Sequence, residues 1–264
     1  MATQCEKGRA HRAGWVGGRV RGIRVPSVLA LALVLALSGC ETSAEKSAQL
    51  EKQAKLAQAR NPVKVSRGLS ITHAGSAVRV VSTQVLHSSE GSAAVVTLRN
   101  VSAHALREVP IAITVRDAGG HVLFQNNAPG LEAALTSVPV LAAGAQFTWV
   151  DDQVQAGGTP ASVSALVGEA PRAPAGALRI ALSAVRATEE AGSSGVAGTV
   201  HNDSAVTQHG LVVYGIARRG GRIVAAGRAV LSEVAAHSSS QFQVLFIGSA
   251  GGAHLEVMAP PSTL

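Results

Sequence analysis

The chain has 264 residues, of which 47% are hydrophobic and 3% aromatic, with 28 glycines and two cysteines. So much apolar surface excludes a wholly disordered polymer, and two cysteines exclude a small protein held together by several disulfides. The formal net charge is +7, but residues 1–39 hold six basic residues and one acidic residue and so carry +5 of it. The rest of the chain carries +2, which gives no large field toward phosphate, so we expect no nucleic-acid partner.

The N-terminal segment has the pattern of a secretory signal. Arg19, Arg21 and Arg24 precede a mostly apolar stretch at residues 25–37. A helix that spans a bilayer needs about 20 apolar residues, so this stretch is too short to span stably. A basic region followed by a short apolar region predicts a signal peptide, here over residues 1–39.

The apolar stretch ends in Leu37-Ser38-Gly39-Cys40, which resembles the lipobox of bacterial lipoproteins. The resemblance implies cleavage before Cys40, a diacylglyceryl thioether on its sulfur, and often acylation, for example with palmitate, of the new amino group. Two or more acyl chains make membrane anchoring stable. An ordinary signal peptide that happens to end in cysteine is the alternative, but the position of Cys40 directly after the apolar region favours lipidation.

The expected location is therefore the cell envelope. In a Gram-negative cell the anchor would be the periplasmic face of the outer membrane, and in a Gram-positive cell the outer face of the plasma membrane. The bilayer, through the acylated Cys40, is the first expected partner.

Residues 40–64 are predicted to form a tether that is helical or frayed. They consist mostly of helix-forming residues, and Pro62 ends the pattern. A short coiled coil is the alternative, but Leu50 and Leu56 are six residues apart, which is the wrong spacing for a seam.

Beyond residue 64 the chain changes to short runs of Val, Thr, Ile and Ser divided by Gly, Asn and Asp, a pattern typical of a β-sandwich or barrel. Two all-β domains are expected, at 65–168 and 177–264, joined by the Pro-rich linker 169–176. The expected strands are 77–87, 93–99, 111–116, 121–124, 146–150 and 162–167 in the first domain, and 178–186, 196–200, 211–216, 222–226, 241–247 and 254–258 in the second.

The second domain repeats motifs of the first in the same order, which indicates a duplicated unit. The glycine pairs are expected to supply the positive φ that tight hairpins need. The matches are Asn100-Val-Ser102 with Asn202-Asp-Ser204, Arg116–Gly120 with Ala217–Gly221, Ala145-Gln-Phe147 with Ser240-Gln-Phe242, and Ala156-Gly-Gly158 with Ala250-Gly-Gly252.

Each unit has a strand, an Asn-x-Ser turn, a hairpin around two glycines, a long loop and a late strand that begins with Gln-Phe. This plan resembles the immunoglobulin-like FxLYD modules of bacterial envelope proteins. Val115–Gly119 and Leu141–Phe147 carry the likeness in the first unit, and Ile216–Gly220 and Phe242 in the second; the Phe-x-Leu-Tyr-Asp string itself is absent. The resemblance implies two tandem Ig-like antiparallel β-sandwich domains and no catalytic residues.

The side chains that could carry chemistry are scattered. Asp151-Asp152 offers too few oxygens for calcium, and the mature chain has no Gly-x-Ser-x-Gly string. Trp149 is expected in the core with Phe147, and Tyr214 is the aromatic residue that could be exposed for ligand stacking. The histidines, at positions 73, 87, 104, 121, 201, 209, 237 and 254, lack metal-ligand spacing. We therefore expect no catalytic, cofactor-binding or metal-binding residues, no cofactor and no enzyme.

The sequence favours a membrane-anchored lipoprotein that displays two Ig-like domains to an unidentified envelope protein, or has a structural or assembly role. The alternative is an accessory lipoprotein of a transporter or envelope complex that binds a small ligand or a metal. That alternative predicts a sizeable pocket between the two domains or a converging set of histidines.

Overall fold

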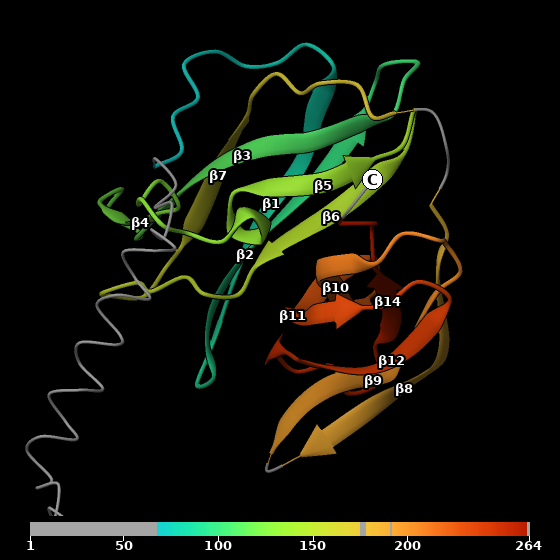
Figure 1. Ribbon diagram of the computed structural model, residues 1–264. Helices are drawn as coiled ribbons and strands as arrows, with labels where there is room; N and C mark the ends of the chain where they lie inside the picture. Colours follow the sequence, from blue (N-terminus) through green and yellow to red (C-terminus); the bar gives the residue numbers. More distant parts are fainter. Residues whose placement is uncertain (1–67, 175–177, 191, 263–264) are drawn as a thin grey trace, which may run out of the picture. The chain divides into compact units, whose positions relative to one another are not determined.

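The computed structural model describes residues 68–174, 178–190 and 192–262 (Figure 1). The chain divides into two compact units, 1–63 and 64–264, and the described residues all belong to the second. They form an all-β structure of antiparallel sheets with one short 3-10 helix. The predicted signal peptide, lipobox cysteine and tether lie outside the described residues.

We call strands β1 to β7 the first half. Its strands are β1 (Val78–Ser88), β2 (Gly91–Asn100), β3 (Leu106–Arg116), β4 (Val122–Gln125), β5 (Ser137–Leu141), β6 (Gln146–Asp151) and β7 (Ser162–Val167), with the 3-10 helix η1 (Ala133–Leu135) before β5. One sheet has the order β1-β2-β6. In the other, β3 pairs with β4, β5 and β7.

We call strands β8 to β14 the second half. Its strands are β8 (Ile180–Glu190), β9 (Ser193–Asn202), β10 (Gln208–Arg219), β11 (Arg222–Val234), β12 (Ser238–Leu245), β13 (Ile247–Gly248) and β14 (His254–Met258). One sheet has the order β12-β9-β8, and the other has the order β13-β11-β10-β14.

All twelve strands expected from the sequence are present, most with shifted ends, and the strand expected at 241–247 is divided into β12 and β13. The sequence did not indicate β5, which lies in the region expected to be a long loop. Pro139 hides it, because proline cannot donate to a ladder and usually marks a break. In the structure, β3 has a positive-φ residue, Glu108 (φ 49°), between the two positions that pair with Val138 and Val140, which flank Pro139. The missing donor of Pro139 is therefore tolerated at an irregularity in the ladder.

The two halves repeat one another in detail at the Asn-x-Ser turns. The Asn100 amide nitrogen donates to the carbonyls of His104, Leu141 and Ala142, at 2.8, 3.1 and 3.1 Å. One repeat later, the Asn202 amide donates to Val206, Val234 and Ala235 at 2.9, 3.1 and 3.0 Å. In both turns the serine hydroxyl donates to the asparagine Oδ1. The predicted structural role of these motifs is confirmed, and each asparagine joins three segments of its half.

The glycine pairs behave nearly as predicted. Gly220 and Gly221 have φ of 57° and 80° and connect β10 to β11 directly, as a two-residue hairpin with two positive φ values requires. Of the corresponding pair in the first half, Gly119 and Gly120, only Gly120 (φ 83°) has a positive φ, because the β3–β4 connection is longer.

The halves differ on one edge of the β3 and β10 sheets. In the second half, β11 runs unbroken along β10, whereas in the first half the corresponding edge is divided into β4 and β5. Asn126 lies in the break and is fully buried. Its Oδ1 accepts from the Ile113 N–H at 2.7 Å, and its Nδ2 donates to the Ile111 and Leu135 carbonyls at 2.8 and 2.7 Å. The Asn126 side chain thus makes the hydrogen bonds to β3 backbone groups that a continuous neighbouring strand would otherwise make.

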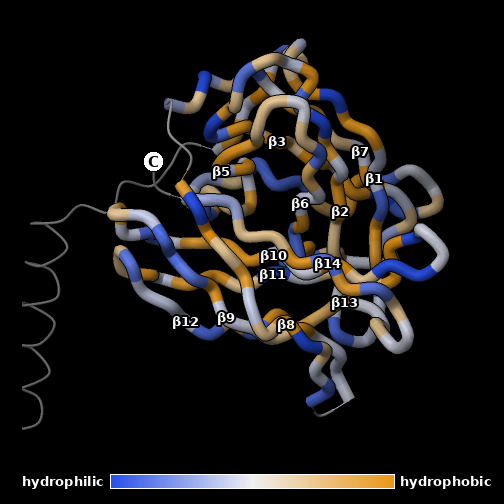
Figure 2. The backbone as a smooth tube through the Cα atoms, turned by 90° about the vertical axis from the view of Figure 1, so that its right-hand side faces the viewer, coloured by the Kyte–Doolittle hydropathy of each residue, from blue (hydrophilic) through white to orange (hydrophobic). Residues whose placement is uncertain are grey.

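The four sheets stack in layers, and the two middle layers belong to different halves (Figures 1 and 2). The β1-β2-β6 sheet of the first half lies against the β13-β11-β10-β14 sheet of the second. This explains why β2 and β10 contain long runs in which every residue is buried, since both faces of these strands are covered. In contrast, the outer strand β12 alternates between buried and exposed residues toward its C-terminal end.

The hydrophobic core follows this layering. One cluster combines the interior of the first half with Val212, Tyr214 and Ile216 of β10 and with residues of β11 and β13. A second cluster fills the interior of the second half. There the aromatic rings lie against glycines: a Cβ on Gly198 would come within 2.8 Å of the Phe242 ring, and one on Gly215 within 2.7 Å of the Phe246 ring.

The described part of the predicted linker is bound to the first half. The Arg107 N–H donates to the Pro171 carbonyl at 3.0 Å, and the Ala173 N–H donates to the Ala105 carbonyl at 2.8 Å. The segment before residue 175 therefore extends the first half as a paired edge.

Candidate functional site between the two halves

Polar side chains cross the boundary between the two middle sheets at three places. The Gln84 amide donates to the Ile223 carbonyl at 2.7 Å, and Arg218 reaches Thr148. At the third place, Arg228 binds Asp152. The last two contacts define the two parts of the candidate site: an open pocket around Arg218 and a buried charged cluster around Arg228.

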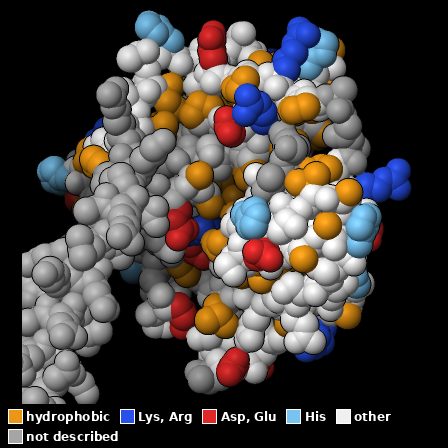
Figure 3. Space-filling model, in the orientation of Figure 1, with side chains coloured by type: hydrophobic (Ala, Val, Ile, Leu, Met, Phe, Trp, Pro, Cys, Tyr) orange, Lys and Arg blue, Asp and Glu red, His pale blue; other side chains and the backbone are white. Residues whose placement is uncertain are grey.

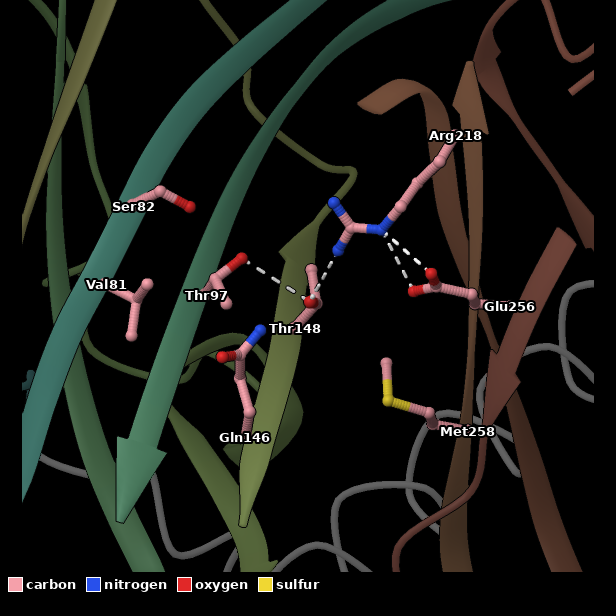
Figure 4. A pocket seen from close by; sticks show the side chains of 8 residues that line it. All are labelled: Val81, Ser82, Thr97, Gln146, Thr148, Arg218, Glu256 and Met258. Atoms are coloured by element: carbon pink, nitrogen blue, oxygen red, sulfur yellow. Dashed lines mark hydrogen bonds and ion pairs between the residues drawn. The ribbon is translucent and has the colours of Figure 1, made fainter. Parts of the chain in front are cut away.

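The pocket has a volume of about 270 Å³ and opens where β1, β2 and β6 face β10 and β14 (Figure 4). Its polar groups come from both halves, and two apolar side chains complete the wall. The lining residues are Val81, Ser82, Thr97, Gln146, Thr148, Arg218, Glu256 and Met258.

Arg218 is the central residue of the pocket. Its Nε lies 3.0 Å from both carboxylate oxygens of Glu256, and its Nη2 donates to the Thr148 hydroxyl at 3.4 Å. The Thr148 hydroxyl also lies 3.4 Å from the Thr97 hydroxyl. Figure 4 shows the guanidinium between the two sheets, with its Nη atoms on the side of the threonines. Because Glu256 balances the charge of Arg218, the pocket is suited to small polar molecules that need both donors and acceptors.

The charged cluster lies deeper in the boundary. The side chain of Arg228, on β11, is 2% exposed; its Nε donates to Asp152 Oδ1 at 2.8 Å, and its backbone N–H donates to Asp152 Oδ2 at 3.0 Å. The Arg228 Nη1 also lies 3.8 Å from a Glu132 carboxylate oxygen. Three buried polar atoms of the cluster have no hydrogen-bond partner: Arg228 Nη1, Asp151 Oδ2 and the Tyr214 hydroxyl. Such buried atoms are costly, since each has lost its hydration without a replacement.

The environment perturbs two titratable groups of the cluster. Burial raises the pKa of Asp151 to about 6, and the charge of Asp152 adds to the rise, while the Gln153 N–H and Arg228 act in the opposite direction. Burial likewise raises the pKa of the Tyr214 phenol well above its usual value. Asp151 is therefore the group of this cluster that changes charge close to neutral pH.

The residues singled out from the sequence have mixed outcomes. Trp149 is fully buried, as predicted, and its indole N–H donates to the Ala134 carbonyl at 3.0 Å. Tyr214, the candidate for an exposed aromatic, is also fully buried, and its ring meets Phe147 edge-on with centroids 5.2 Å apart. The stacking role considered for Tyr214 is thus wrong, because the second middle sheet buries it against the first half. Asp151 and Asp152 diverge, since Asp152 alone pairs with Arg228.

The connection between β3 and β4 contains an interacting pair of side chains, Asp117 and His121. Asp117 Oδ1 accepts from the His121 N–H at 2.8 Å, and its Oδ2 lies 3.0 Å from the His121 ring. These bonds to His121 hold the pKa of the Asp117 carboxyl below its usual range. Within the described ranges, no group of three or more His, Cys, Asp or Glu side chains is arranged to hold a metal ion.

One histidine joins three strands of the outer sheet. The His201 Nε2 lies 2.6 Å from the Ser183 hydroxyl, and its Nδ1 lies 2.7 Å from the Ser239 hydroxyl. All three hydrogen-bonded groups are solvent-accessible on the sheet that comprises β8, β9 and β12, and none of them lines the pocket. They form a cross-strand ladder that links the three strands.

Sequence reasoning did not identify Arg218, Glu256 or Arg228. A signal was present: Arg228 interrupts the small apolar run 223–231, and Asp151-Asp152 follow a strand that contains Trp149. Charges at such positions indicate either exposure or a buried pair. The sequence does not show that both faces of these sheets are covered, and without that knowledge a buried ion pair cannot be distinguished from exposed charges.

Comparison of the chain with protein-family models and with curated protein sequences gives no match. None of the helical structure in the described residues has the length and hydropathy needed to cross a bilayer. The function must therefore be argued from the residues themselves.

Proposed function

We propose that the protein is a lipid-anchored cell-envelope protein that displays two Ig-like β-sandwich domains for protein–protein interaction or a structural role in assembly. The observation that carries the proposal is the string Leu37-Ser38-Gly39-Cys40 at the end of a short apolar segment behind three arginines. A thioether-linked diacylglycerol on Cys40 would hold the chain at the membrane, because two acyl chains together give stable anchoring.

The duplicated β unit supports the Ig-like part of this proposal. Each half contains a three-stranded sheet and a second sheet, and the same asparagine network joins the Asn-x-Ser turn to the segment that precedes the late strand. Repeated binding or scaffold modules of this kind offer loops and outer sheet faces to partners, while their cores supply rigidity.

The surface is consistent with contact through small areas. On the face shown in Figure 3, acidic, basic and hydrophobic side chains occur in small groups with no large area of a single kind. The large hydrophobic side chains that are exposed are spread over the described residues. Val101 directly follows β2, and the other six lie on different strands: Val81, Val122, Leu166, Val185, Val230 and Leu245. A partner held on the same membrane would need only weak contacts, because anchoring raises the effective concentration.

The anchor is tested by changing the sulfur. Full-length protein and a Cys40→Ala variant are expressed in a bacterial host that processes lipoproteins, and the membrane and soluble fractions are compared. The wild type is expected in the membrane fraction with an acylated N-terminal peptide by mass spectrometry, and Cys40→Ala is expected to leave that fraction. Unchanged partitioning, or an unmodified thiol in the wild type, would refute the proposal.

The pocket around Arg218 favours a second candidate, an accessory lipoprotein that binds a small polar ligand. The pocket holds donors and acceptors from both halves and is of a size that suits a small molecule. Arg218→Ala removes the cationic group, and Arg222→Ala, on the exposed end of β11, is the matched control. Thermal-shift screening of polar metabolites should find a stabilising ligand whose effect is lost only in Arg218→Ala; a screen without such a ligand argues for display alone.

A further inference from the structure

We propose that the docking of the two halves is sensitive to pH: the contact is tight when the Asp151 carboxyl is protonated and loosens when it ionises. This inference goes beyond the proposed function and does not depend on lipidation. It rests on the buried cluster formed by β6, β10 and β11, where charged groups of the first half meet a charged group of the second.

The Asp151 carboxyl has few hydrogen-bond partners in the cluster. Its Oδ1 accepts the Gln153 N–H at 2.9 Å, and its Oδ2 is buried without a hydrogen-bond donor. The nearest guanidinium binds the neighbouring residue: the Arg228 Nε donates to Asp152, and its buried Nη1 donates neither to Asp151 nor to any other group.

Other titratable groups surround the Asp151 carboxyl. In the described part of the chain, the titratable groups around Asp151 are Asp152, which directly follows β6, Arg228 on β11 and Tyr214 on β10, and Glu132 in turn reaches Arg228. Glu132 is mostly exposed, so ionised Asp151 would bring the buried set to two carboxylates, Asp151 and Asp152, beside a single guanidinium. An unbalanced negative charge in a dry interface is unfavourable, and separation of the halves relieves it by admitting water.

The charged cluster lies at the contact between the two halves, where a change of its charge affects how tightly they dock. Asp152 and Arg228 lie on the two sheets that face each other, and Tyr214 of the second half packs on Phe147 of the first. At the position that corresponds to Asp151 one repeat later, the second half has Phe246, which is buried in that half's own core. The carboxyl therefore occurs in the half whose sheet is covered by the other half.

The experiment measures opening of the contact in the full chain in detergent micelles. Amide hydrogen exchange, corrected for the intrinsic pH dependence, is followed at peptide level between pH 4 and pH 7. Because the pKa of Asp151 is raised from 3.8 to about 6, opening of β2 and β10 is expected to increase with pH, up to about a hundredfold. The outer strands β9 and β12 are expected to change much less.

Asp151→Asn, which keeps the shape and the acceptor for the Gln153 N–H, is expected to abolish this increase. The matched control is Asp203→Asn, which makes the same chemical change at an exposed turn position and should retain the wild-type profile. The proposal is overturned if Asp151→Asn keeps the pH dependence, or if outer and middle strands open equally. Should Asp151→Asn not fold, the wild-type profile decides, since equal opening at pH 4 and pH 7 also overturns it.

Discussion

The first and second halves follow one plan and differ in two places, one of which lies where the halves meet. Both use an asparagine that binds three carbonyls at the same turn. Only the first half has a divided edge strand repaired by Asn126, and only the first half has the acidic pair Asp151-Asp152 at the end of its late strand, where the second half has Phe246-Ile247. The asparagine turns that the halves share hold each half together. Asn126 also acts within its own half, whereas Asp152 of the acidic pair takes part in the contact between the halves.

The largest effect is expected where the halves are joined by charge. Arg228→Met should lower the free energy of unfolding by about 3–5 kcal/mol, because it leaves the Asp152 carboxylate buried without a counter-charge. The measurement is urea unfolding followed by circular dichroism. The double variant Arg228→Met/Asp152→Leu should recover much of the loss, since it removes both charges; a double variant as unstable as Arg228→Met would show that the pair is not the cause.

The equivalence of the halves is tested at the asparagines. Asn100→Ala and Asn202→Ala should each cost about 3 kcal/mol, because each leaves three buried or partly buried carbonyls without a donor. Ser204→Ala, which removes a hydroxyl that donates to Asn202, is the milder comparison at about 1 kcal/mol. Thermal unfolding of all three variants gives the ranking, and a large difference between the two asparagine variants would break the equivalence.

The acidic pair gives a prediction in which the sign depends on pH. The pKa of Asp151 is raised to about 6 in the folded protein from 3.8, so the folded state holds this proton more tightly than the unfolded state. The folded state is therefore favoured below about pH 4 and loses stability as the pH rises through about 6. Asp151→Asn should remove that loss and stabilise the protein by up to about 3 kcal/mol at pH 7. Denaturant midpoints at pH 4.5 and 7 measure it, and a destabilised variant at pH 7 would contradict the assignment.

The smallest effect is expected on the outer sheet of the second half. Ser183→Ala or Ser239→Ala removes one hydrogen bond of the ladder around His201 in a solvent-accessible setting. Exposed hydrogen bonds are readily replaced by water, so each change should stay within about 0.5 kcal/mol. A larger loss in thermal unfolding would mean that this sheet depends on its surface ladder more than on the core beneath it.

The sequence by itself determined the strands, the turns and the duplication. Strands are indicated by alternating apolar residues, and turns by glycine or asparagine between them. Both signals depend only on residues that are close in the chain, which is why twelve strands could be located from the sequence alone. Pro139 hid β5 because proline is a local break signal, and the structure accommodates it opposite Glu108, which has a positive φ in the neighbouring strand. The lipobox at Cys40 is likewise readable as a local string, and it stays a prediction.

Only the tertiary structure decided which strand faces are covered. One face of β10 carries Val212, Tyr214 and Ile216, a pattern that is compatible with an exposed or a covered sheet face. Docking of the first half buries these side chains in the hydrophobic core. The same docking turns Asp151, Asp152 and Arg228 from surface charges into a buried cluster, and it creates the pocket around Arg218. Because burial on a second face depends on a partner sheet more than 50 residues away in the chain, no pattern within one strand can reveal it.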